Sequence, residues 1–162
     1  KQMASEVKSG DSENHEARAA KAYWSQLFLH EFRREREGLW PNAALNYGYA
    51  VLRAATARAV VAAGLLPTLG IHHSNKYNAF CLADDLMEPY RPFIDLEVVD
   101  LMQQGYDELN KEGKAALIGA VLADVKQEGK KGPLMVALHR TATGLMRCFA
   151  GTARKLPYPE LK

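Results

Sequence analysis

The sequence predicts an all-α fold: a single domain of several helices around one central, buried, alanine-rich helix. The chain has 162 residues, of which 48% are apolar, enough for one compact core but hardly for two. Apolar residues recur at three- and four-residue steps along most of the chain. β-Branched residues never alternate with polar ones over the length of a strand, and no Asn-Gly turn joins two strand-like runs. We therefore expect about six helices and no sheet.

The first helix is expected to follow a polar N-terminal segment. Residues 1–12 are rich in Ser, Lys and Glu and have no apolar period, which is typical of a flexible lead-in. Ser12 or Asn14 is suited to cap the helix, and Gly38 is suited to end it.

The second helix is expected to be the central and most buried element. Pro41 begins it, and Gly64 ends a helix that covers Asn42–Ala63. Alanine lies on nearly every side of this helix, so other helices can approach it closely.

The breakers Pro67 and Gly70 predict a loop over Leu65–Asn78, before a short helix at Ala79–Glu88. Three further helices are expected at Ile94–Gln104, Lys114–Gln127 and Pro133–Phe149. The helical domain therefore covers residues 13–152, and residues 153–162 form a C-terminal tail.

Composition excludes several classes of protein. The two cysteines, Cys81 and Cys148, provide neither a disulfide framework nor a four-ligand zinc site, which fits a reducing cytoplasm. The polar N-terminus lacks the apolar core of a secretory signal, and no stretch of about 20 residues is apolar enough to cross a membrane. Because the chain starts at Lys1, we expect it to be a fragment of a longer protein.

The charge is unevenly distributed. From residue 126 to residue 162 there are eight Lys or Arg against two acids, a net charge of +6, whereas residues 1–125 carry 13 bases and 17 acids, a net charge of −4. An acidic body with a basic end suits a metal site that acts on a polyanion. A solvated basic tail is the alternative interpretation.

Generic catalytic motifs are absent from the sequence. Two His-Glu pairs begin at His15 and His30, but Ala19 and Arg34 occupy the positions where a zinc protease needs its second histidine. There is no P-loop and no Gly-x-Ser-x-Gly nucleophile elbow. These absences argue against nucleotide hydrolysis and serine esterase chemistry.

A cluster of histidines and acids is the strongest candidate site. His72 and His73 lie on the expected loop, and Asp84, Asp85 and Glu88 follow within one turn of the short helix. Three carboxylates on one side of a helix repel one another unless a cation relieves them.

Two interpretations of this cluster are open from spacing alone. In the first, Arg91 and Lys76 neutralise the acids and the cluster is structural. In the second, one imidazole and carboxylates bind a divalent metal ion.

Four blocks carry a resemblance to a known family. They are Asn14–Trp24 (NHEARAAKAYW), Asn42–Tyr49 (NAALNYGY), Leu69–His73 (LGIHH) and Ala79–Asp95 (AFCLADDLMEPYRPFID). In this order and spacing they resemble the catalytic domain of the CRISPR-associated Cas-one integrase family, which acts in spacer acquisition. The LGIHH and DLMEPYRPFID runs look most like the type II branch. The resemblance covers about residues 12–150, the helical C-terminal domain of the family, and we expect the N-terminal β-domain of the family to be absent from this chain.

The resemblance implies a metal site and its ligands. Carried over position by position, the ligands are Glu16, His73 and Glu88, with Asp85 as a weaker candidate and His72 as the alternative if the register is wrong by one residue. Two carboxylates and one imidazole suit Mg²⁺ or Mn²⁺ and leave positions open for phosphate oxygens.

The resemblance also implies a function. The family inserts short foreign DNA into a CRISPR array by transesterification, which contributes to antiviral defence. The expected partners are double-stranded DNA, the Cas-two protein, a second copy of the full-length chain and other type II adaptation proteins, with no membrane. A helical module derived from the integrase that binds DNA or protein without catalysis is the alternative. Six basic residues are candidates for phosphate contacts: Arg58, Lys76, Arg91, Arg147, Arg154 and Lys155.

Overall fold

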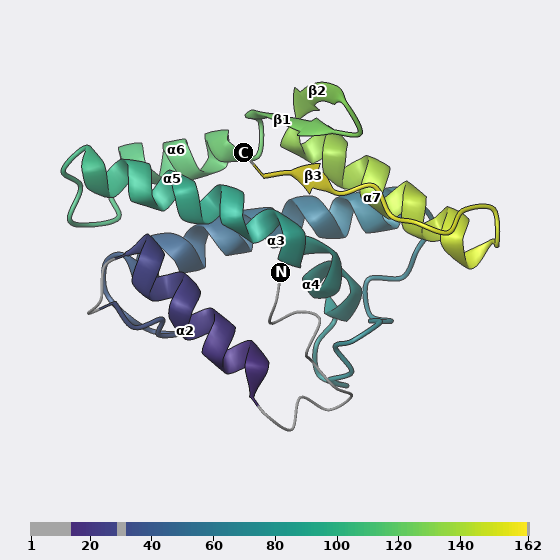
Figure 1. Ribbon diagram of the computed structural model, residues 1–162, viewed down its shortest axis with the longest axis horizontal. Coiled ribbons are helices and arrows are strands. Elements are labelled where there is room, and N and C mark those ends of the chain that lie inside the picture. The colour runs from purple at the N-terminus through teal and green to yellow at the C-terminus, as the bar shows by residue number, and fades with distance from the viewer. Residues whose placement is uncertain (1–13, 29–31, 162) are drawn as a thin grey trace. The chain divides into compact units, whose positions relative to one another are not determined.

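The computed structural model describes residues 14–28 and 32–161 (Figure 1). The chain forms two compact units, Lys1–Gly38 and Leu39–Lys162. The expected lead-in, residues 1–12, lies outside the described residues. Among the described helices, none combines the length and the apolar character that crossing a lipid bilayer requires.

The first unit contains helix α2, His15–Leu27, preceded by Asn14 in the left-handed conformation. The expectation that this helix extends to Gly38 is wrong, because it ends at Leu27 and residues 32–38 are not helical. The rings of Trp24, Phe28 and Phe32 pack together instead, with centroids 4.6–5.8 Å apart. The apolar spacing beyond Leu27 therefore reflects a local aromatic cluster and not a longer helix.

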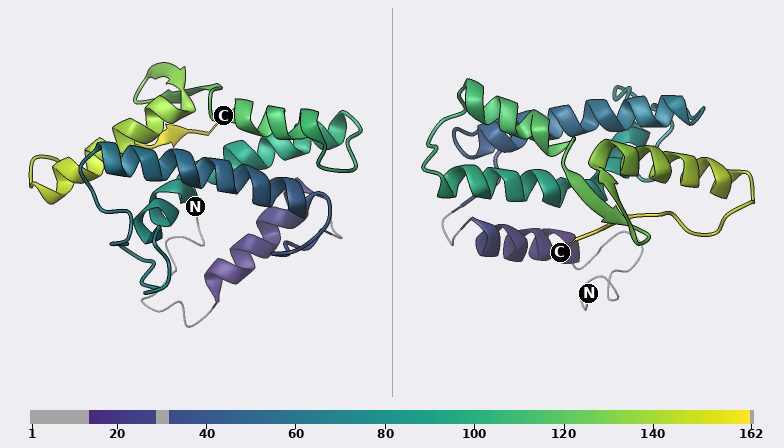
Figure 2. Two further views of the ribbon diagram at one scale, coloured as in Figure 1. Left: turned by 180° about the vertical axis from the view of Figure 1, so that it is seen from behind. Right: turned by 90° about the horizontal axis from the view of Figure 1, so that it is seen from above.

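Helix α3, Asn42–Ala62, is the centre of the second unit, as its alanine content predicts. It packs against the four other α-helices of the unit, and Leu45, Leu52 and Val60 are fully buried. Both views in Figure 2 show the surrounding helices gathered along it. Small side chains permit this close approach because they keep helix surfaces flat.

The remaining helices lie close to the expected positions, except that the helix expected at Lys114–Gln127 ends at Ala120. They are α4 (Cys81–Met87), the 3₁₀ helix η1 (Glu88–Tyr90), α5 (Arg91–Gln103), α6 (Lys111–Ala120) and α7 (Leu134–Phe149). Asn110 caps α6 by accepting a hydrogen bond from the backbone N–H of Gly113 at 2.9 Å. The most amphipathic of these helices is α7, whose buried face includes Leu134, Leu138 and Leu145.

A small antiparallel sheet corrects the expectation of an exclusively helical fold. Strands β1 (Asp124–Gln127), β2 (Lys130–Pro133) and β3 (Pro159–Glu160) pair in the order β2-β1-β3. The expected helix Lys114–Gln127 is therefore wrong in its second half. The connecting residues Glu128 and Gly129 have φ of 51° and 75°. Two successive left-handed residues form the type of turn whose twist matches a hairpin, although Glu-Gly is a weak sequence signal for it.

The C-terminal segment runs beside α7 (Figure 2, right). A buried polar network holds it there. The Gln127 side chain, 1% exposed, donates hydrogen bonds to the carbonyl oxygens of Ala137 and Pro157 at 3.2 and 3.0 Å. The Thr141 hydroxyl also donates to the Pro157 carbonyl, at 2.5 Å. The second half of the expected tail is thus tied to the sheet and to α7.

The close contact between α3 and α5 provides a stability prediction. A Cβ atom at Gly48 would lie 2.4 Å from the Cγ2 of buried Ile94. We expect Gly48→Ala to lower the free energy of unfolding by about 1–3 kcal/mol, because the buried helices must shift to admit a methyl group. Gly119→Ala on α6, where nothing lies within 4 Å of the new Cβ, is the matched control and should be neutral or stabilising. Urea denaturation of both variants measures the difference, and equal effects would contradict the packing argument.

Candidate metal centre

The loop between α3 and α4 carries His72 and His73. Its start is fastened to α4 by a hydrogen bond from the backbone N–H of Leu82 to the carbonyl of Pro67, at 2.8 Å. Gly70 lies against the same helix, where an added Cβ would be 2.2 Å from the His73 carbonyl oxygen and 2.8 Å from the Cβ of Cys81. Only glycine fits this approach, so Gly70 is required for the position of the histidines.

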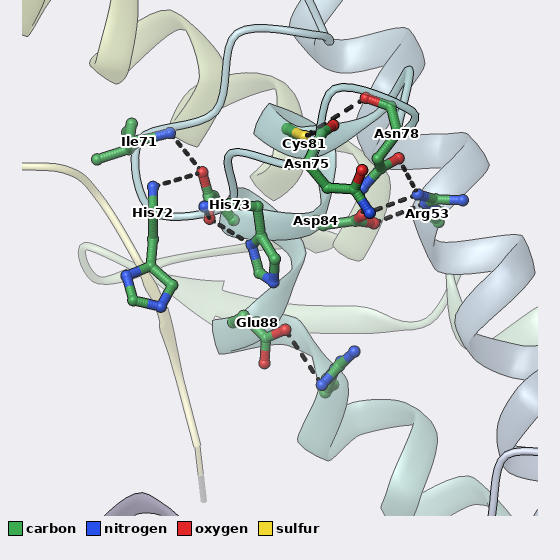
Figure 3. A network of polar contacts seen from close by, with 11 residues as sticks. Arg53, Ile71, His72, His73, Asn75, Asn78, Cys81, Asp84 and Glu88 are labelled. Carbon is green, nitrogen blue, oxygen red and sulfur yellow. Dashed lines mark hydrogen bonds and ion pairs between the residues drawn. The ribbon is translucent and has the colours of Figure 1, made fainter. Parts of the chain in front are cut away.

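The Asp85 carboxylate holds the loop from the side of α4. It accepts hydrogen bonds from the backbone N–H groups of Ile71, His72 and His73, at 2.5, 3.0 and 3.1 Å (Figure 3). It also lies 2.6 Å from the Nδ1 of His73. Only 8% of the Asp85 side chain is exposed, and four contacts on two oxygens leave it little capacity to bind a metal ion. Its geometry is that of a residue that positions His73.

These contacts keep the Asp85 carboxylate ionised. Burial raises the pKa of Asp85, but the hydrogen bonds from the backbone of His72, the ring of His73 and the backbone of Ile71 outweigh it and lower the pKa below its usual value. Because Asp85 is ionised at neutral pH, the proton of a neutral His73 ring is assigned to Nδ1. The Nε2 lone pair of His73 is then available to a metal ion.

Asp84 belongs to a separate network. The Arg53 guanidinium of α3 binds both of its oxygens, at 2.6 and 2.7 Å, and Asn78 donates a further hydrogen bond at 2.7 Å (Figure 3). The structural interpretation therefore describes Asp84, although the cation that relieves it is Arg53 and not Lys76. The ammonium of Lys76 lies over the Tyr77 ring, 4.9 Å from its centroid.

Glu88 lies at the start of η1, where α4 ends. Its side chain is 45% exposed and forms an ion pair with Arg91 at 3.1 Å. The Arg91 guanidinium also stacks on Tyr49, 4.8 Å from the ring centroid, and the Tyr49 hydroxyl donates a hydrogen bond to buried Asp95. Arg91 is thus held on both sides, which limits the positions available to the Glu88 carboxylate.

Two of the three expected metal ligands, His73 and Glu88, lie in the unit Leu39–Lys162. In Figure 3 the His73 ring extends toward the side on which the Glu88 carboxylate lies. The third ligand, Glu16, belongs to helix α2, but its side chain lies outside the described residues. Within the described part of the chain, no three His, Cys, Asp or Glu residues gather to hold a metal ion. The donor set Glu16, His73 and Glu88 thus stays a prediction.

His72, the alternative ligand, and the basic residues expected to contact phosphate lie at several separate places in the structure. His72 is exposed, and its ring meets His73 edge to face at 5.7 Å. Arg58 is exposed on α3, and Arg154 is exposed beyond α7. Arg147 and Lys155 line the same cavity beside α7.

Sequence reasoning missed two residues that position the site. Arg53 neutralises Asp84 from 31 residues earlier in the chain, so helical spacing gives no indication of this pair. Gly70 is a loop breaker in the sequence, and its close approach to α4 depends on tertiary contact. The signal that was available is a glycine two residues before paired histidines.

The lowered pKa values of Asp84 and Asp85 predict how the stability of the fold depends on pH. Burial raises the pKa of Asp84, but Arg53 and Asn78 outweigh it and lower the pKa. The pKa of Asp85 is also lowered. Both carboxylates therefore stabilise the fold at pH values above the pKa of about 4 that Asp has in the unfolded chain. This contribution is lost as pH falls through their pKa values in the folded protein. We expect Asp84→Asn to cost about 1–3 kcal/mol at pH 7 and much less at pH 3.

Urea denaturation at both pH values measures this effect. Asp107→Asn, at an exposed position, is the control and should change stability by less than about 0.5 kcal/mol at either pH. A loss in Asp84→Asn that is the same at pH 7 and pH 3 would contradict the assignment.

Comparison with solved structures defines the class of fold. The chain is similar to a casposase bound to integration product, with a TM-score of 0.73, 22% sequence identity and coverage of 90% of this chain and 49% of that one. At this identity the similarity concerns the fold.

Sequence comparison then identifies the family. The family model of CRISPR associated protein Cas1 matches residues 2–121, and the chain belongs to this family. The CRISPR-associated endonuclease Cas1 of Neisseria meningitidis serogroup C is 40% identical, over 98% of this chain and 53% of the relative. The CRISPR-associated endonuclease Cas1 2 of Pyrobaculum aerophilum is 35% identical, over 83% of this chain and 47% of the relative. The chain thus spans about half the length of these relatives.

Proposed function

We propose that residues 13–152 form the catalytic helical domain of a type II Cas1 integrase, a metal-dependent endonuclease that inserts foreign DNA into a CRISPR array. The observation that carries the proposal is the set of contacts by which the Asp85 carboxylate holds the backbone of Ile71 and the Nδ1 of His73. The His73 ring extends from there toward the side on which the Glu88 carboxylate lies (Figure 3). The type II assignment rests on the LGIHH and DLMEPYRPFID runs.

The donor set fits a divalent cation. An imidazole whose Nδ1 is hydrogen-bonded to a carboxylate is typical of a metal ligand that binds through Nε2. Carboxylates are the preferred ligands of Mg²⁺ and Mn²⁺. Glu16, His73 and Glu88 would hold the ion, and Asp85 would orient His73. When bound, such an ion supplies Lewis-acid stabilisation of the charge that develops on a phosphodiester oxygen.

The side chains of this chain have separate roles in the proposed reaction. The 3′-hydroxyl of the incoming DNA attacks a phosphodiester at the edge of the repeat. A new phosphodiester forms as the bond from that phosphorus to the 3′-oxygen of the repeat strand breaks, and this oxygen leaves as a 3′-hydroxyl, so no covalent bond to the protein is needed. Asp85 keeps the Nδ1 proton of His73 in place, and Arg91 limits the movement of Glu88. Basic side chains bind phosphates along the DNA. The candidates are Arg58, Lys76, Arg91, Arg147, Arg154 and Lys155.

The proposed partners follow from the same assignment. Double-stranded DNA is the substrate, and in the full-length protein a homodimer with the Cas-two protein and other type II adaptation proteins completes the assembly. We propose that the reaction takes place in the cytoplasm, where the CRISPR array is located.

A cleavage and integration assay tests the proposal. Duplex DNA with free 3′-hydroxyl ends and a repeat-containing plasmid are incubated with this chain, and separately with a full-length chain, in Mn²⁺, Mg²⁺ or EDTA. We expect nicked and joined products with either metal and none in EDTA. DNA binding without products from the full-length chain in any metal would favour the non-catalytic module.

A further inference from the structure

A second group of polar side chains lines a cavity of about 550 Å³ that is separate from the His73 loop. The cavity is bordered by the β1–β2 hairpin, by α7 and by the C-terminal segment, and none of its lining residues comes from α3, α4 or α5. Four of the lining residues are basic: Lys130, Arg140, Arg147 and Lys155. Glu128 is the one acid among the lining residues.

The basic residues of the cavity lack the ion pairs that the other lysines of the hairpin make. Lys126 pairs with Glu160 at 3.0 Å, and Lys131 pairs with Asp124 at 3.5 Å. By contrast, Lys130, Arg140, Arg147 and Lys155 make no ion pair with any residue in the described part of the chain. Of the five Lys and Arg residues in 126–161 that make no such ion pair, four line the cavity and Arg154 does not.

Strand register and helix spacing direct these side chains to one place. Lys130 lies opposite Gln127 in the β1–β2 ladder, so both occupy the same face of the hairpin, and Gln127 is buried against α7. On α7, Arg140 and Arg147 are two helical turns apart and share one side of the helix. Lys155 reaches the cavity from the C-terminal segment.

The wall of the cavity is fixed before any ligand binds. The Pro157 carbonyl accepts hydrogen bonds from both Gln127 and Thr141. Pro157 also lies against Gly144, where an added Cβ would be 2.6 Å from its Cδ. Because the segment that carries Lys155 is already ordered, binding needs little further loss of conformational entropy.

We propose that this cavity binds the phosphate backbone of a nucleic-acid strand at a position separate from the metal centre. Guanidinium and ammonium groups without carboxylate partners are suited to phosphate oxygens. A volume of about 550 Å³ exceeds what one phosphate needs, and Val136 and Pro157 provide apolar surface for a sugar or base. This inference rests on the proposed function insofar as that function supplies the nucleic acid.

Binding of labelled single-stranded and duplex DNA in EDTA, at several salt concentrations, tests the inference on this chain. The cavity variant is Lys130→Gln with Lys155→Gln, and the matched control is Lys126→Gln with Lys131→Gln. Both remove two lysine charges from exposed positions, and thermal unfolding verifies that each variant is folded. We expect the cavity variant to bind about 10–100-fold more weakly and to reduce the salt slope by about 1.8, because two phosphate contacts are lost. The control should change affinity less than about 3-fold.

Equal losses in the two variants would overturn the inference, since they would reflect net charge alone. Failure of wild type to bind DNA in EDTA would also overturn it. Because EDTA removes divalent metal ions, this binding does not depend on the metal centre, so a failure of the metal-dependent function is distinguishable from a failure of the cavity.

Competition of the bound DNA with a mononucleotide and with inorganic phosphate shows whether the cavity prefers a nucleic-acid strand, a free nucleotide or free phosphate. We expect either competitor to displace the strand only at millimolar concentration. Binding of the mononucleotide as tight as that of the strand, and weakened in the cavity variant, would make this a site for free nucleotides and overturn the assignment.

Discussion

Replacing His73 with alanine is expected to lower metal-dependent cleavage and integration by the intact protein at least about 100-fold. The Nδ1 of His73 is bound to Asp85, so Nε2 is the donor that the metal ion would lose. The initial rate of nicking in Mn²⁺ measures the effect. DNA affinity in EDTA should be unchanged, because the proposed role of the imidazole is to bind a metal ion, which EDTA removes.

His72→Ala is the matched control for this prediction. His72 donates a hydrogen bond from its backbone N–H to the Asp85 carboxylate, and alanine keeps that group. We therefore expect a much smaller loss of activity than in His73→Ala. The reverse pattern, in which His72→Ala abolishes activity and His73→Ala retains it, would mean that the ligand register is wrong by one residue.

Asp85→Asn is expected to reduce metal-dependent activity about 10–100-fold by weakening metal affinity. An amide presents one acceptor oxygen where the carboxylate has two, so the contacts to the loop and to Nδ1 of His73 cannot all persist. Titration of activity with Mn²⁺ separates the roles. If Asp85 positions His73, high Mn²⁺ restores part of the activity, whereas a merely structural role predicts a loss that metal does not rescue.

Asp84→Asn is the control for Asp85→Asn at the neighbouring position. Asp84 is bound to Arg53 and Asn78, so its substitution should lower stability but leave the Mn²⁺ requirement within about 3-fold of wild type. A similar change in the Mn²⁺ requirement of both variants would contradict the division of the acids into two networks.

The sequence predicts the central helix and the helices at Ile94–Gln104 and Pro133–Phe149 well, because their apolar residues repeat with the helical period. Asn42–Ala63 was expected, and Asn42–Ala62 is the observed helix. The sheet could not be predicted from periodicity, because β1 and β2 have four residues each and Glu128–Gly129 is an uncommon turn pair. Short strands depend on tertiary partners, here the buried Gln127 and the C-terminal segment.

The candidate site was predictable in its composition but not in its contacts. Spacing placed three acids near two histidines, and the family resemblance selected His73 and Glu88 among them. The division of roles depends on distant residues: Arg53 neutralises Asp84, whereas Asp85 turns toward the loop that Gly70 allows to approach. Side-chain partners of this kind are set by packing, which local sequence does not specify.

Electron paramagnetic resonance of bound Mn²⁺ tests the central claim most directly, on this chain and without any DNA. We expect one Mn²⁺ ion to show coupling to a directly bound nitrogen. This coupling should be lost in His73→Ala and kept in His72→Ala, and Mn²⁺ affinity should fall in Glu16→Gln and Glu88→Gln. Nitrogen coupling and Mn²⁺ affinity that are the same in wild type and His73→Ala would contradict the assignment of His73 as a metal ligand.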